Sequence, residues 1–427
     1  TTGFGLDLGQ ASNFTNLTLV NATAMTGGGL AINAAGSTAV GFSFLGSDSA
    51  DAIMLSRDTL NASETLNGGG GKDILATTSF NNVSIGVNRT VGFEVLAAVN
   101  SQSSLNASSF TGIHEFLFFS RNGNTNITGV ESNDRFVLED DQRGGDETLR
   151  FTGENAGNSV VFEMRASDKT GGEVIIVAND NTGNDVGAVG FRNGISSVTI
   201  DSTGQNSSAN LIEAVRTGNY SFYAFNNENG LANFTITGSQ SLTIAAKEGV
   251  DLSSSSRIMG FQNDANVNAS SFTGVLRIAG SNSNDVITGG SNSDIIYGLN
   301  GNDTLTGNGG SDQFRMVGAR GTDRIKDFVQ GVDKIGTNNV DFSNTTATFA
   351  GATLSALDYV DNRSGITSIG AADDKKVIEL QTALSTSQIQ TDTGAAVAAY
   401  VLVFNSTTSK AELWFDSNWS TGGRSQV

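Results

Sequence analysis

Four aspartates recur at a fixed interval of nine residues between Gly280 and Arg315. The segment divides into GSNSNDVIT, GGSNSDIIY, GLNGNDTLT and GNGGSDQFR, and its aspartates are Asp285, Asp294, Asp303 and Asp312. An apolar residue follows each aspartate by two positions, at Ile287, Ile296, Leu305 and Phe314. Carboxylates and backbone carbonyls are the ligands that a hard divalent cation prefers. We therefore expect these turns to bind a cation.

The repeat resembles the calcium-binding nonapeptide G-G-x-G-x-D-x-U-x of RTX proteins, in which U is a large apolar residue. Glycines in its first half permit a tight turn with positive φ angles, which lets backbone carbonyls point at the cation. The second half is a short strand whose apolar residue faces inward. Beside the four aspartates, the expected metal-binding residues are Gly280, Asn282, Gly289, Gly298, Asn300, Gly307 and Gly309. Ser283 replaces a glycine and is expected to weaken the outermost turn.

Two nines make one coil of a β-roll, so that successive nines alternate between two facing parallel sheets. Turns that are two repeats apart then stack on the same edge. We expect Asp285 to share calcium ions with Asp303, and Asp294 to share them with Asp312. Calcium accepts six to eight oxygen ligands, whereas magnesium requires a smaller octahedron and retains its water.

Degenerate copies of the turn occur earlier in the chain. The segment Gly68 to Ala76 reads GGGGKDILA and contains Asp73, and Asp51 stands in the same register of an earlier copy. The step of 13 residues from Asp51 to Glu64 recurs between Asp134 and Glu147, at an offset of 83. We expect Asp51, Glu64, Asp73 and Asp134 to bind calcium. The alternative is that these turns have kept their shape and lost the ion.

Short apolar segments elsewhere, such as residues 198–201 and 241–245, have spacings suited to the coils of a parallel β-solenoid. The sequence NASSFTG occurs twice, at residues 106–112 and 268–274, each time before a β-rich run. Helical periodicity is poor, with residues 383–399 as the best exception. The predicted fold is therefore all-β: an extended parallel β-solenoid and β-roll with calcium-binding turns and a C-terminal β-hairpin region.

Composition narrows the possible functions. The chain has 53 Gly, no Pro and no Cys, so disulfides and thiolate metal sites are excluded. Its 25 Phe and 37% hydrophobic residues predict a packed core. A net charge of -19 argues against nucleic acid as a partner. The longest apolar run is well short of the roughly 18 to 20 residues that cross a bilayer, so we expect no membrane insertion.

Residues 40 to 330, approximately, resemble bacterial RTX surface-layer proteins, which are exported by type I secretion and assemble into a crystalline coat. The four nines, the unit SADAIML…ETLNGGGGKDIL and the motifs VGFEVLAAVN and NASSFTG carry this resemblance. It implies a secreted protein of the bacterial cell surface that self-assembles into a lattice or filament and has cell-surface polysaccharide as a possible second partner. An adhesin or extracellular filament subunit that binds a surface or glycan remains the alternative, because it also uses calcium-rigidified solenoids.

After the repeats, GTDRIKDFVQGVDKIG (residues 321–336) is similar to the segment that closes RTX β-rolls, where Asp323 and Asp327 would bind a last ion. Residues 400–404 and 411–416 predict a hairpin in a β region near the export signal. The expected parts of the chain are an N-terminal solenoid with a degenerate unit, a middle solenoid, the β-roll and the C-terminal β region, at residues 1–100, 101–279, 280–336 and 337–427.

Catalytic motifs are missing from the sequence. The only histidine, His114, has no H-E-x-x-H motif around it and no G-x-S-x-G motif beside it. The 43 acidic residues are mostly in turns at repeat positions, and no catalytic constellation stands out. We therefore expect that the protein is not an enzyme, and that His114 caps or faces solvent on a strand.

Overall fold

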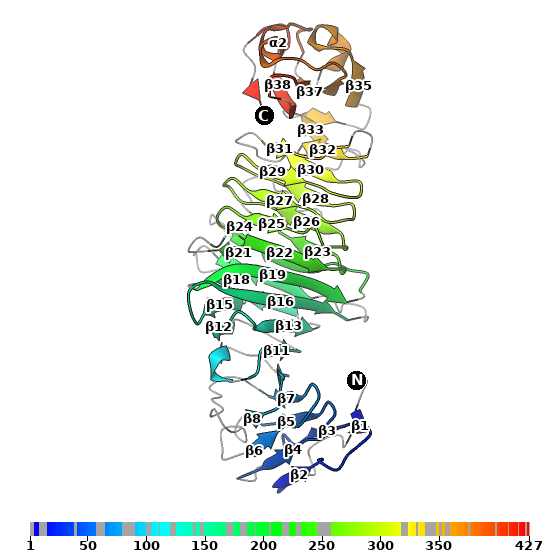
Figure 1. Cartoon of the computed structure of the whole chain (residues 1–427). Coiled ribbons are helices and arrows are strands. Elements are labelled where there is room, and N and C mark those ends of the chain that lie inside the picture. The colour runs from blue at the N-terminus through cyan, green and yellow to red at the C-terminus, as the bar shows by residue number, and fades with distance from the viewer. Residues whose placement is uncertain are drawn as a thin grey trace. The chain divides into compact units, whose positions relative to one another are not determined.

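The computed structural model is almost entirely β structure (Figure 1), which confirms the predicted all-β fold. It describes residues 4–7, 15–37, 41–56, 65–78, 90–99, 104–110, 112–119, 125–139, 142–145, 149–167, 174–179, 186–192, 194–204, 206–215, 222–227, 231, 233–245, 258–316, 323–329, 332–337, 347–349, 352–354, 359–374, 376–397, 399–408, 410–416, 418–422 and 425–426. The chain forms two compact units, unit 1 (Thr1–Thr243) and unit 2 (Ile244–Val427). The division into four parts stays a prediction.

Unit 1 is a parallel β-solenoid built on one long sheet, sheet 1. Its strands lie on successive coils in the order β1 (Phe4–Asp7), β3 (Gly29–Asn33), β5 (Ala52–Leu55), β7 (Ile74–Thr77), β9 (Val95–Ala98), β11 (Glu115–Phe118), β13 (Arg135–Glu139), β16 (Asn158–Ala166), β19 (Ile195–Gly204) and β22 (Asn233–Gly238). The first coils are two-sided, and their second side, sheet 2, comprises β2 (Leu19–Asn21), β4 (Ser43–Leu45), β6 (Thr65–Asn67) and β8 (Thr90–Val91).

The coils of unit 1 become three-sided from β13 onward. Sheet 3 comprises β10 (Ser104–Asn106), β12 (Thr125–Val130), β15 (Leu149–Gly153), β18 (Val186–Phe191) and β21 (Phe222–Asn227). Sheet 4 comprises β14 (Gln142–Gly145), β17 (Ile175–Asn179), β20 (Asn210–Val215) and β23 (Leu242–Ile244). Each later coil therefore contributes one strand to each of three sheets.

Aromatic rings fill the interior of these coils. Phe116 of sheet 1 stacks on Phe136 with ring centroids 5.2 Å apart, and Phe136 meets Phe151 of sheet 3 at 5.1 Å. Phe151 in turn stacks on Phe191 at 5.6 Å, and all four side chains are fully buried. Aromatic pairs of this kind contribute about 0.5–1.5 kcal/mol beyond the area that they bury. These phenylalanines thus form a continuous aromatic column, which is part of the packed core that the composition predicted.

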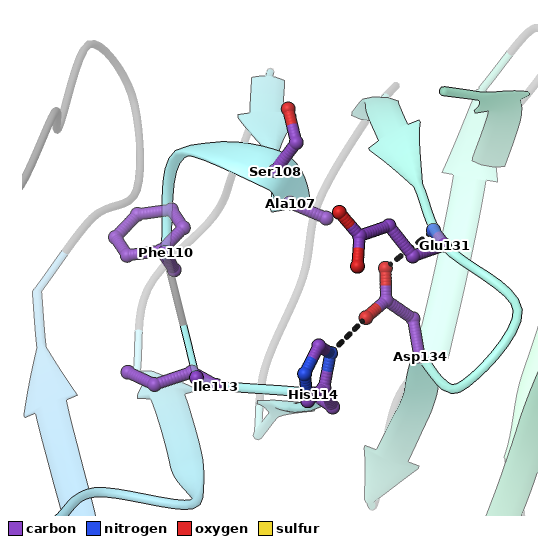
Figure 2. A pocket seen from close by; sticks show the side chains of 8 residues that line it. Ala107, Ser108, Phe110, Ile113, His114, Glu131 and Asp134 are labelled. Atoms are coloured by element: carbon purple, nitrogen blue, oxygen red, sulfur yellow. Dashed lines mark hydrogen bonds and ion pairs between the residues drawn. The ribbon is translucent and has the colours of Figure 1, made fainter. Parts of the chain in front are cut away.

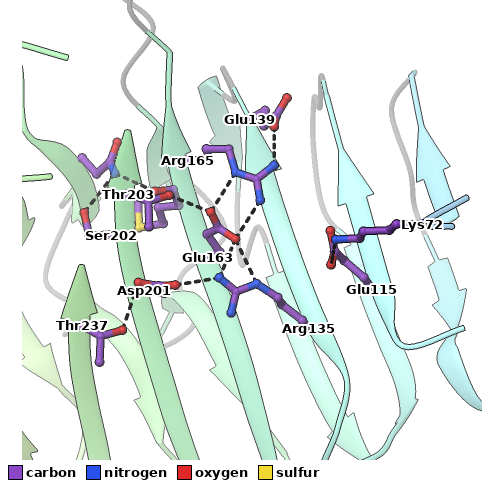
Figure 3. A network of polar contacts seen from close by, with 12 residues as sticks. Lys72, Glu115, Arg135, Glu139, Glu163, Arg165, Asp201, Ser202, Thr203 and Thr237 are labelled. Carbon is purple, nitrogen blue, oxygen red and sulfur yellow. Dashed lines mark hydrogen bonds and ion pairs between the residues drawn. The ribbon is translucent and has the colours of Figure 1, made fainter. Parts of the chain in front are cut away.

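The outer face of sheet 1 carries a network of ion pairs that joins β13, β16 and β19 (Figure 3). The buried Glu163 carboxylate accepts hydrogen bonds from Arg135 (2.6 and 3.0 Å) and from Arg165 (2.8 and 3.0 Å). Arg135 also pairs with Asp201 at 2.6 Å. Burial raises the pKa of Glu163, but hydrogen bonds from Arg165 and Thr203 outweigh this effect and hold it below the ordinary value. The network ties neighbouring coils together through charged side chains.

Unit 2 begins, after β24 (Ile258–Phe261), with two-sided coils. One side comprises β25 (Asn266–Asn268), β27 (Val286–Thr288), β29 (Thr304–Thr306) and β31 (Arg324–Ile325). The other comprises β26 (Leu276–Ala279), β28 (Ile295–Tyr297), β30 (Gln313–Met316) and β32 (Lys334–Thr337). Ile287 pairs in register with Leu305, and Ile296 with Phe314, and all four are fully buried. The nines therefore alternate between two parallel sheets, as predicted.

The rest of unit 2 contains an antiparallel pair and a mixed sheet. The pair is β33 (Ala347–Phe349) with β34 (Ala352–Leu354). The mixed sheet has the order β35 (Tyr359–Arg363), β36 (Lys376–Leu380), β37 (Ala399–Asn405), β38 (Lys410–Asp416) and β39 (Ser425–Gln426). β37 and β38 are antiparallel neighbours, which confirms the predicted hairpin. Trp414 and Trp419 are buried in its core.

Helical structure is sparse in the described part of the chain. Its only α-helix is α2 (Thr386–Thr391), which begins after Ser385, whose hydroxyl accepts a hydrogen bond from Gln388. The helical pattern at residues 383–399 is thus realised over six residues only. The short 3₁₀ helices are η2 (Ala107–Ser109), η4 (Ile366–Ser368) and η5 (Ala371–Asp373). No helix among the described residues is both long and apolar enough to span a bilayer.

The two NASSFTG copies adopt similar turns. Asn106 ends β10 and Asn268 ends β25, and in each copy the alanine that follows is buried. The backbone N–H of Phe110 bonds to the Ala107 carbonyl at 3.0 Å, and that of Phe272 bonds to the Ala269 carbonyl at 2.8 Å. The motif is therefore a corner at which the chain leaves a strand and buries a phenylalanine.

Phe151→Ala should lower the free energy of unfolding by about 3–5 kcal/mol, because it leaves a cavity where two sheets meet. Phe119→Ala is the matched control, since that side chain is 40% exposed and its loss should cost less than about 0.5 kcal/mol. Urea unfolding in saturating calcium, followed by circular dichroism, measures both. Equal effects of the two substitutions would contradict the aromatic column.

Candidate metal centre

The aspartates of the nonapeptides form a ladder on one edge of the unit 2 coils. The backbone N–H of Asp285 donates to Asp303 Oδ1 at 2.8 Å, and the N–H of Asp303 donates to Asp323 Oδ1 at 3.0 Å. The N–H of Ala265, at the equivalent position one coil earlier, donates to Asp285 Oδ1 at 2.7 Å. Each carboxylate thus reaches back to the preceding coil. We call this series the first ladder.

A second ladder runs along the opposite edge with the same geometry. The N–H of Leu276 donates to Asp294 Oδ1 at 2.8 Å, the N–H of Asp294 donates to Asp312 Oδ1 at 2.8 Å, and that of Asp312 donates to Asp333 Oδ1 at 3.0 Å. The structure therefore stacks Asp285 on Asp303, and Asp294 on Asp312. These are the pairs that the sequence predicted would share calcium ions.

The segment after the repeats closes both ladders. Asp323 ends the first ladder, whereas Asp327 accepts hydrogen bonds from the N–H groups of Gly307 (2.9 Å) and Asn308 (2.7 Å). Asp333, which the sequence analysis missed, ends the second ladder and also accepts a bond from the N–H of Val329 at 2.7 Å. It stands 21 residues after Asp312, so the nine-residue period did not reveal it.

The expected ligand residues lie in the turns beside the ladders. Gly280, Gly289, Gly298 and Gly307 each stand five residues before an aspartate, close to its Oδ2 atom. A methyl group on Gly280 or Gly298 would lie 2.5 Å from that oxygen, so neither position has room for a side chain. The Asn300 amide donates to Asn282 Oδ1 at 2.7 Å, and the Gly309 N–H bonds to the Gly290 carbonyl at 3.2 Å.

Left-handed backbone occurs at the second and fourth positions of the last two nines. Leu299 and Asn308 have φ values of 74° and 66°, and Gly301 and Gly310 have values of 130° and 116°. The first nine instead uses a serine, because the N–H of Ser281 donates to Asp285 Oδ2 at 2.6 Å and its hydroxyl donates to Oδ1 at 3.1 Å. A hydroxyl thus supports the turn in which Ser283 replaces glycine.

Burial and neighbouring carboxylates raise the pKa values of the ladder aspartates. Burial raises the pKa of Asp294 to about 7, and the nearby Asp312 carboxylate adds to the effect. Burial also raises the pKa of Asp285 to about 6. Burial raises the pKa of both Asp303 and Asp323, and the Asp323 carboxylate raises the pKa of Asp303 further. The ladders therefore resist full ionisation without a compensating cation.

The donor set of the ladders fits calcium. Among the described residues, no three acidic or histidine side chains converge closely enough to hold a metal by themselves. A cation at the ladders would therefore also use backbone carbonyls or water. Asp303 Oδ2 is buried and accepts no hydrogen bond, although it faces the glycine turn. Carboxylates mixed with carbonyls are the ligand type of a hard cation with six to eight oxygens.

Unit 1 contains a shorter ladder of the same kind. The N–H of Leu30 donates to Asp51 Oδ1 at 2.5 Å, that of Asp51 donates to Asp73 Oδ1 at 2.6 Å, and that of Asp73 donates to Glu94 Oε2 at 2.8 Å. Glu94 was not predicted, because its turn lacks the glycine spacing. Glu64, which was predicted, lies outside the described residues. Asp51 and Asp73 are fully buried.

His114 and Asp134 occupy the next two positions of this series, immediately before β11 and β13 (Figure 2). His114 Nδ1 lies 2.9 Å from Asp134 Oδ1, and the Glu131 N–H donates to Asp134 Oδ2 at 2.8 Å. Burial raises the pKa of Asp134, although both of these hydrogen bonds act in the opposite direction. The histidine side chain is 40% exposed beside a small pocket. His114 thus lies on the same edge of the coils as the ladder of unit 1 and pairs with Asp134. We call each side chain at a ladder position a rung.

Without calcium, the repeats should be more stable at pH 5 than at pH 8. The unfolded aspartates lose their protons near pH 3.8, whereas the buried ones keep them until about pH 6 to 7. Stability that is present in acid is therefore lost as the pH rises through these higher values. Thermal melts in EGTA, followed by circular dichroism, should show a melting transition of the repeats at pH 5 and, at pH 8, a lower melting temperature or no folded repeats at all.

Millimolar calcium should remove this loss, because the cation binds the ionised form. Asp294→Asn, which keeps the side-chain shape without the charge, should show a smaller difference between the two pH values in EGTA. A melting temperature in EGTA that does not fall between pH 5 and pH 8 would contradict the effect of the buried carboxyls.

Comparison with protein families identifies the turns that carry the two ladders. Residues 279–314 match the RTX calcium-binding nonapeptide repeat in four copies. No curated protein and no solved structure matches the chain. Proteins with these repeats are typically secreted to the cell exterior, and the repeats bind calcium. The chain therefore carries RTX calcium-binding repeats over residues 279–314, which contain Asp285, Asp294, Asp303 and Asp312.

Proposed function

We propose that this protein is a secreted structural protein that self-assembles into a bacterial surface layer when calcium folds and stiffens its coils. The observation that carries the proposal is where the buried acidic side chains of the described residues lie and what they bond to. Seven of them, Asp51, Asp73, Asp134, Asp285, Asp294, Asp303 and Asp312, stand at ladder positions before strands. The other three in the described residues bond to structural partners: Glu163 to two arginines, Asp373 to Arg363, and Glu412 to Asn405 and Trp414.

Such a distribution supports a structural role and not a catalytic one. Active sites usually keep a buried group with a shifted pKa facing a pocket and available for chemistry. In this chain the carboxyl groups with raised pKa values stand at ladder positions, and they are Asp73, Asp134, Asp285, Asp294, Asp303, Asp312 and Asp323. The histidine beside the small pocket is itself bonded to a rung, Asp134.

Calcium supplies the switch in this proposal. Free calcium is low inside a cell, where the ionised rungs repel one another and the repeats stay unfolded. Outside the cell, sites with dissociation constants of about 10⁻⁴ to 10⁻³ M fill and fold the chain. Location then decides when the coils form and when copies of the chain can associate.

Assembly needs surfaces that another copy can meet. The described residues include exposed apolar side chains on strands of both units, such as Val91 (59% exposed) and Val286 (40%). Strand edges offer further backbone donors and acceptors for a neighbouring copy. Both features suit a protein that pairs with itself, and cell-surface polysaccharide is the second partner that we propose.

Electron microscopy with parallel light scattering tests the proposal. The chain should remain unassembled in EGTA and form ordered two-dimensional sheets after addition of millimolar calcium. Asp303→Ala combined with Asp312→Ala should abolish calcium-dependent folding of the repeats, and with it the sheets, because it removes one rung from each ladder. The variant should also bind fewer calcium ions.

The same experiment separates the coat from its alternative. Monomers that gain β structure with calcium and never assemble would contradict a surface layer. That result would favour an adhesin, for which glycan-array binding is the next measurement. Sheets formed equally well in EGTA would contradict the calcium switch.

A further inference from the structure

Two turns of unit 1 reproduce the hydrogen bonds of the RTX turns, although they lie outside residues 279–314. The segment GSDSAD ends at Asp51, and the first nine of the RTX repeats begins with GSNSND and reaches Asp285. The N–H of Ser47 donates to Asp51 Oδ2 at 2.6 Å, and that of Ser281 donates to Asp285 Oδ2 at 2.6 Å. The two serine hydroxyls also reach Oδ1 of the same aspartates, at 3.3 and 3.1 Å.

The next coil repeats the likeness at the following aspartate. The Asp51 N–H donates to Asp73 Oδ1 at 2.6 Å, as the Asp285 N–H donates to Asp303 Oδ1 at 2.8 Å. Among the described residues, two buried carboxylate oxygens accept no hydrogen bond, and they are Asp73 Oδ2 and Asp303 Oδ2. A buried carboxylate oxygen without a partner is costly unless a cation meets it. The Oδ2 atom without a hydrogen-bond partner thus belongs to the corresponding aspartate in each unit.

The glycines around these oxygens also correspond. A methyl group on Gly68 would lie 2.6 Å from Asp73 Oδ2, and one on Gly298 would lie 2.5 Å from Asp303 Oδ2. One coil earlier, Gly46 lies beside the Gly68 carbonyl oxygen, as Gly280 lies beside that of Gly298. Both units therefore place a carboxylate and a glycine carbonyl from successive coils around one turn.

The two units differ in the number of residues that separate successive aspartates of a ladder. Asp51 and Asp73 are 22 residues apart, whereas Asp285 and Asp303 are 18 apart. Both aspartates of unit 1 stand five residues after a glycine, so the turn itself is unchanged. In the sequence, the extra residues fall between β5 and Gly68.

The nearest lysine does not neutralise the turn. Lys72 precedes Asp73 in the chain, but its Nζ pairs with Glu115 Oε2 at 2.7 Å, and its side chain is 60% exposed. The negative charge of Asp51, Asp73 and Glu94 is thus left for another cation. We infer that the turns Gly46–Asp51 and Gly68–Asp73 form a second calcium site, in unit 1, independent of the RTX repeats. This site does not depend on self-assembly.

Amide hydrogen exchange with peptide resolution, on the full chain, locates the binding of calcium alone. In the wild type, calcium should slow exchange at least tenfold in peptides from residues 46–56 and 65–77, as well as in those from 280–315. Asp73→Asn should abolish the slowing in the first set and leave the second set unchanged. The matched variant Asp303→Asn should do the reverse. Mass spectrometry of metal content should show fewer bound calcium ions in each variant.

The asparagine is chosen because it keeps the acceptor for the Asp51 N–H while it removes the charge. Peptides from β16 and β19, which carry no rung, report whether a variant is folded, and Asp51→Asn replaces Asp73→Asn if they exchange rapidly. Calcium that leaves residues 46–56 and 65–77 of the wild type unprotected overturns the site. So does protection that persists in the folded Asp73→Asn variant, or equal protection by magnesium.

Discussion

The structure depends on one repeated contact, in which a side-chain carboxylate accepts a hydrogen bond from the backbone N–H of the preceding coil. The contact fixes the spacing and register of parallel coils, and it also brings acidic groups together on one edge. A hydrogen bond to an N–H favours the ionised carboxylate, but burial and neighbouring charges oppose it more strongly at Asp294 and Asp303. A bound cation therefore removes a free-energy penalty that the folded and fully ionised ladders would otherwise carry. Cation binding and coil stacking are for this reason one process.

Unit 1 shows how a solenoid continues where the ladder ends. Beyond Asp134 the coils become three-sided, and the position of the carboxylates passes to Val160 and Val198, which are buried. Other contacts stabilise these three-sided coils, namely the aromatic column in the interior and the Glu163 network on the outer face. Glu163 has two guanidinium partners, so its charge is compensated within the protein. In the second half of unit 1 arginine compensates the buried charge, and in the first half we infer that a calcium ion does so.

Sequence periodicity predicted the features that depend on local geometry. The turn from glycine to aspartate is complete within six residues, and Ile287, Ile296, Leu305 and Phe314 had to face inward once the strands formed. The hairpin of residues 400–404 and 411–416 was recognisable for the same reason. Features that depend on register between coils of unequal length were not predictable. Glu94, His114 and Asp333 stand at ladder positions because of the lengths of the coils that precede them. These lengths are irregular, so no spacing in the sequence reveals the three residues. The three-sided coils were also missed, since β14 and β17 carry no period of their own.

The ladders have a direction, because every carboxylate points to the coil before it. Ala265 and Leu276 supply an N–H but no carboxylate, so each ladder has a blunt start, and Asp323 and Asp333 supply its last rungs. A coil inserted between these ends would bring its own donor and its own acceptor and leave its neighbours unchanged. The unit of such a duplication is a pair of nonapeptides. Gain or loss of a single nonapeptide would move every later strand to the opposite sheet and separate the final rungs from their ladders. Evolution can therefore lengthen this roll only by even steps.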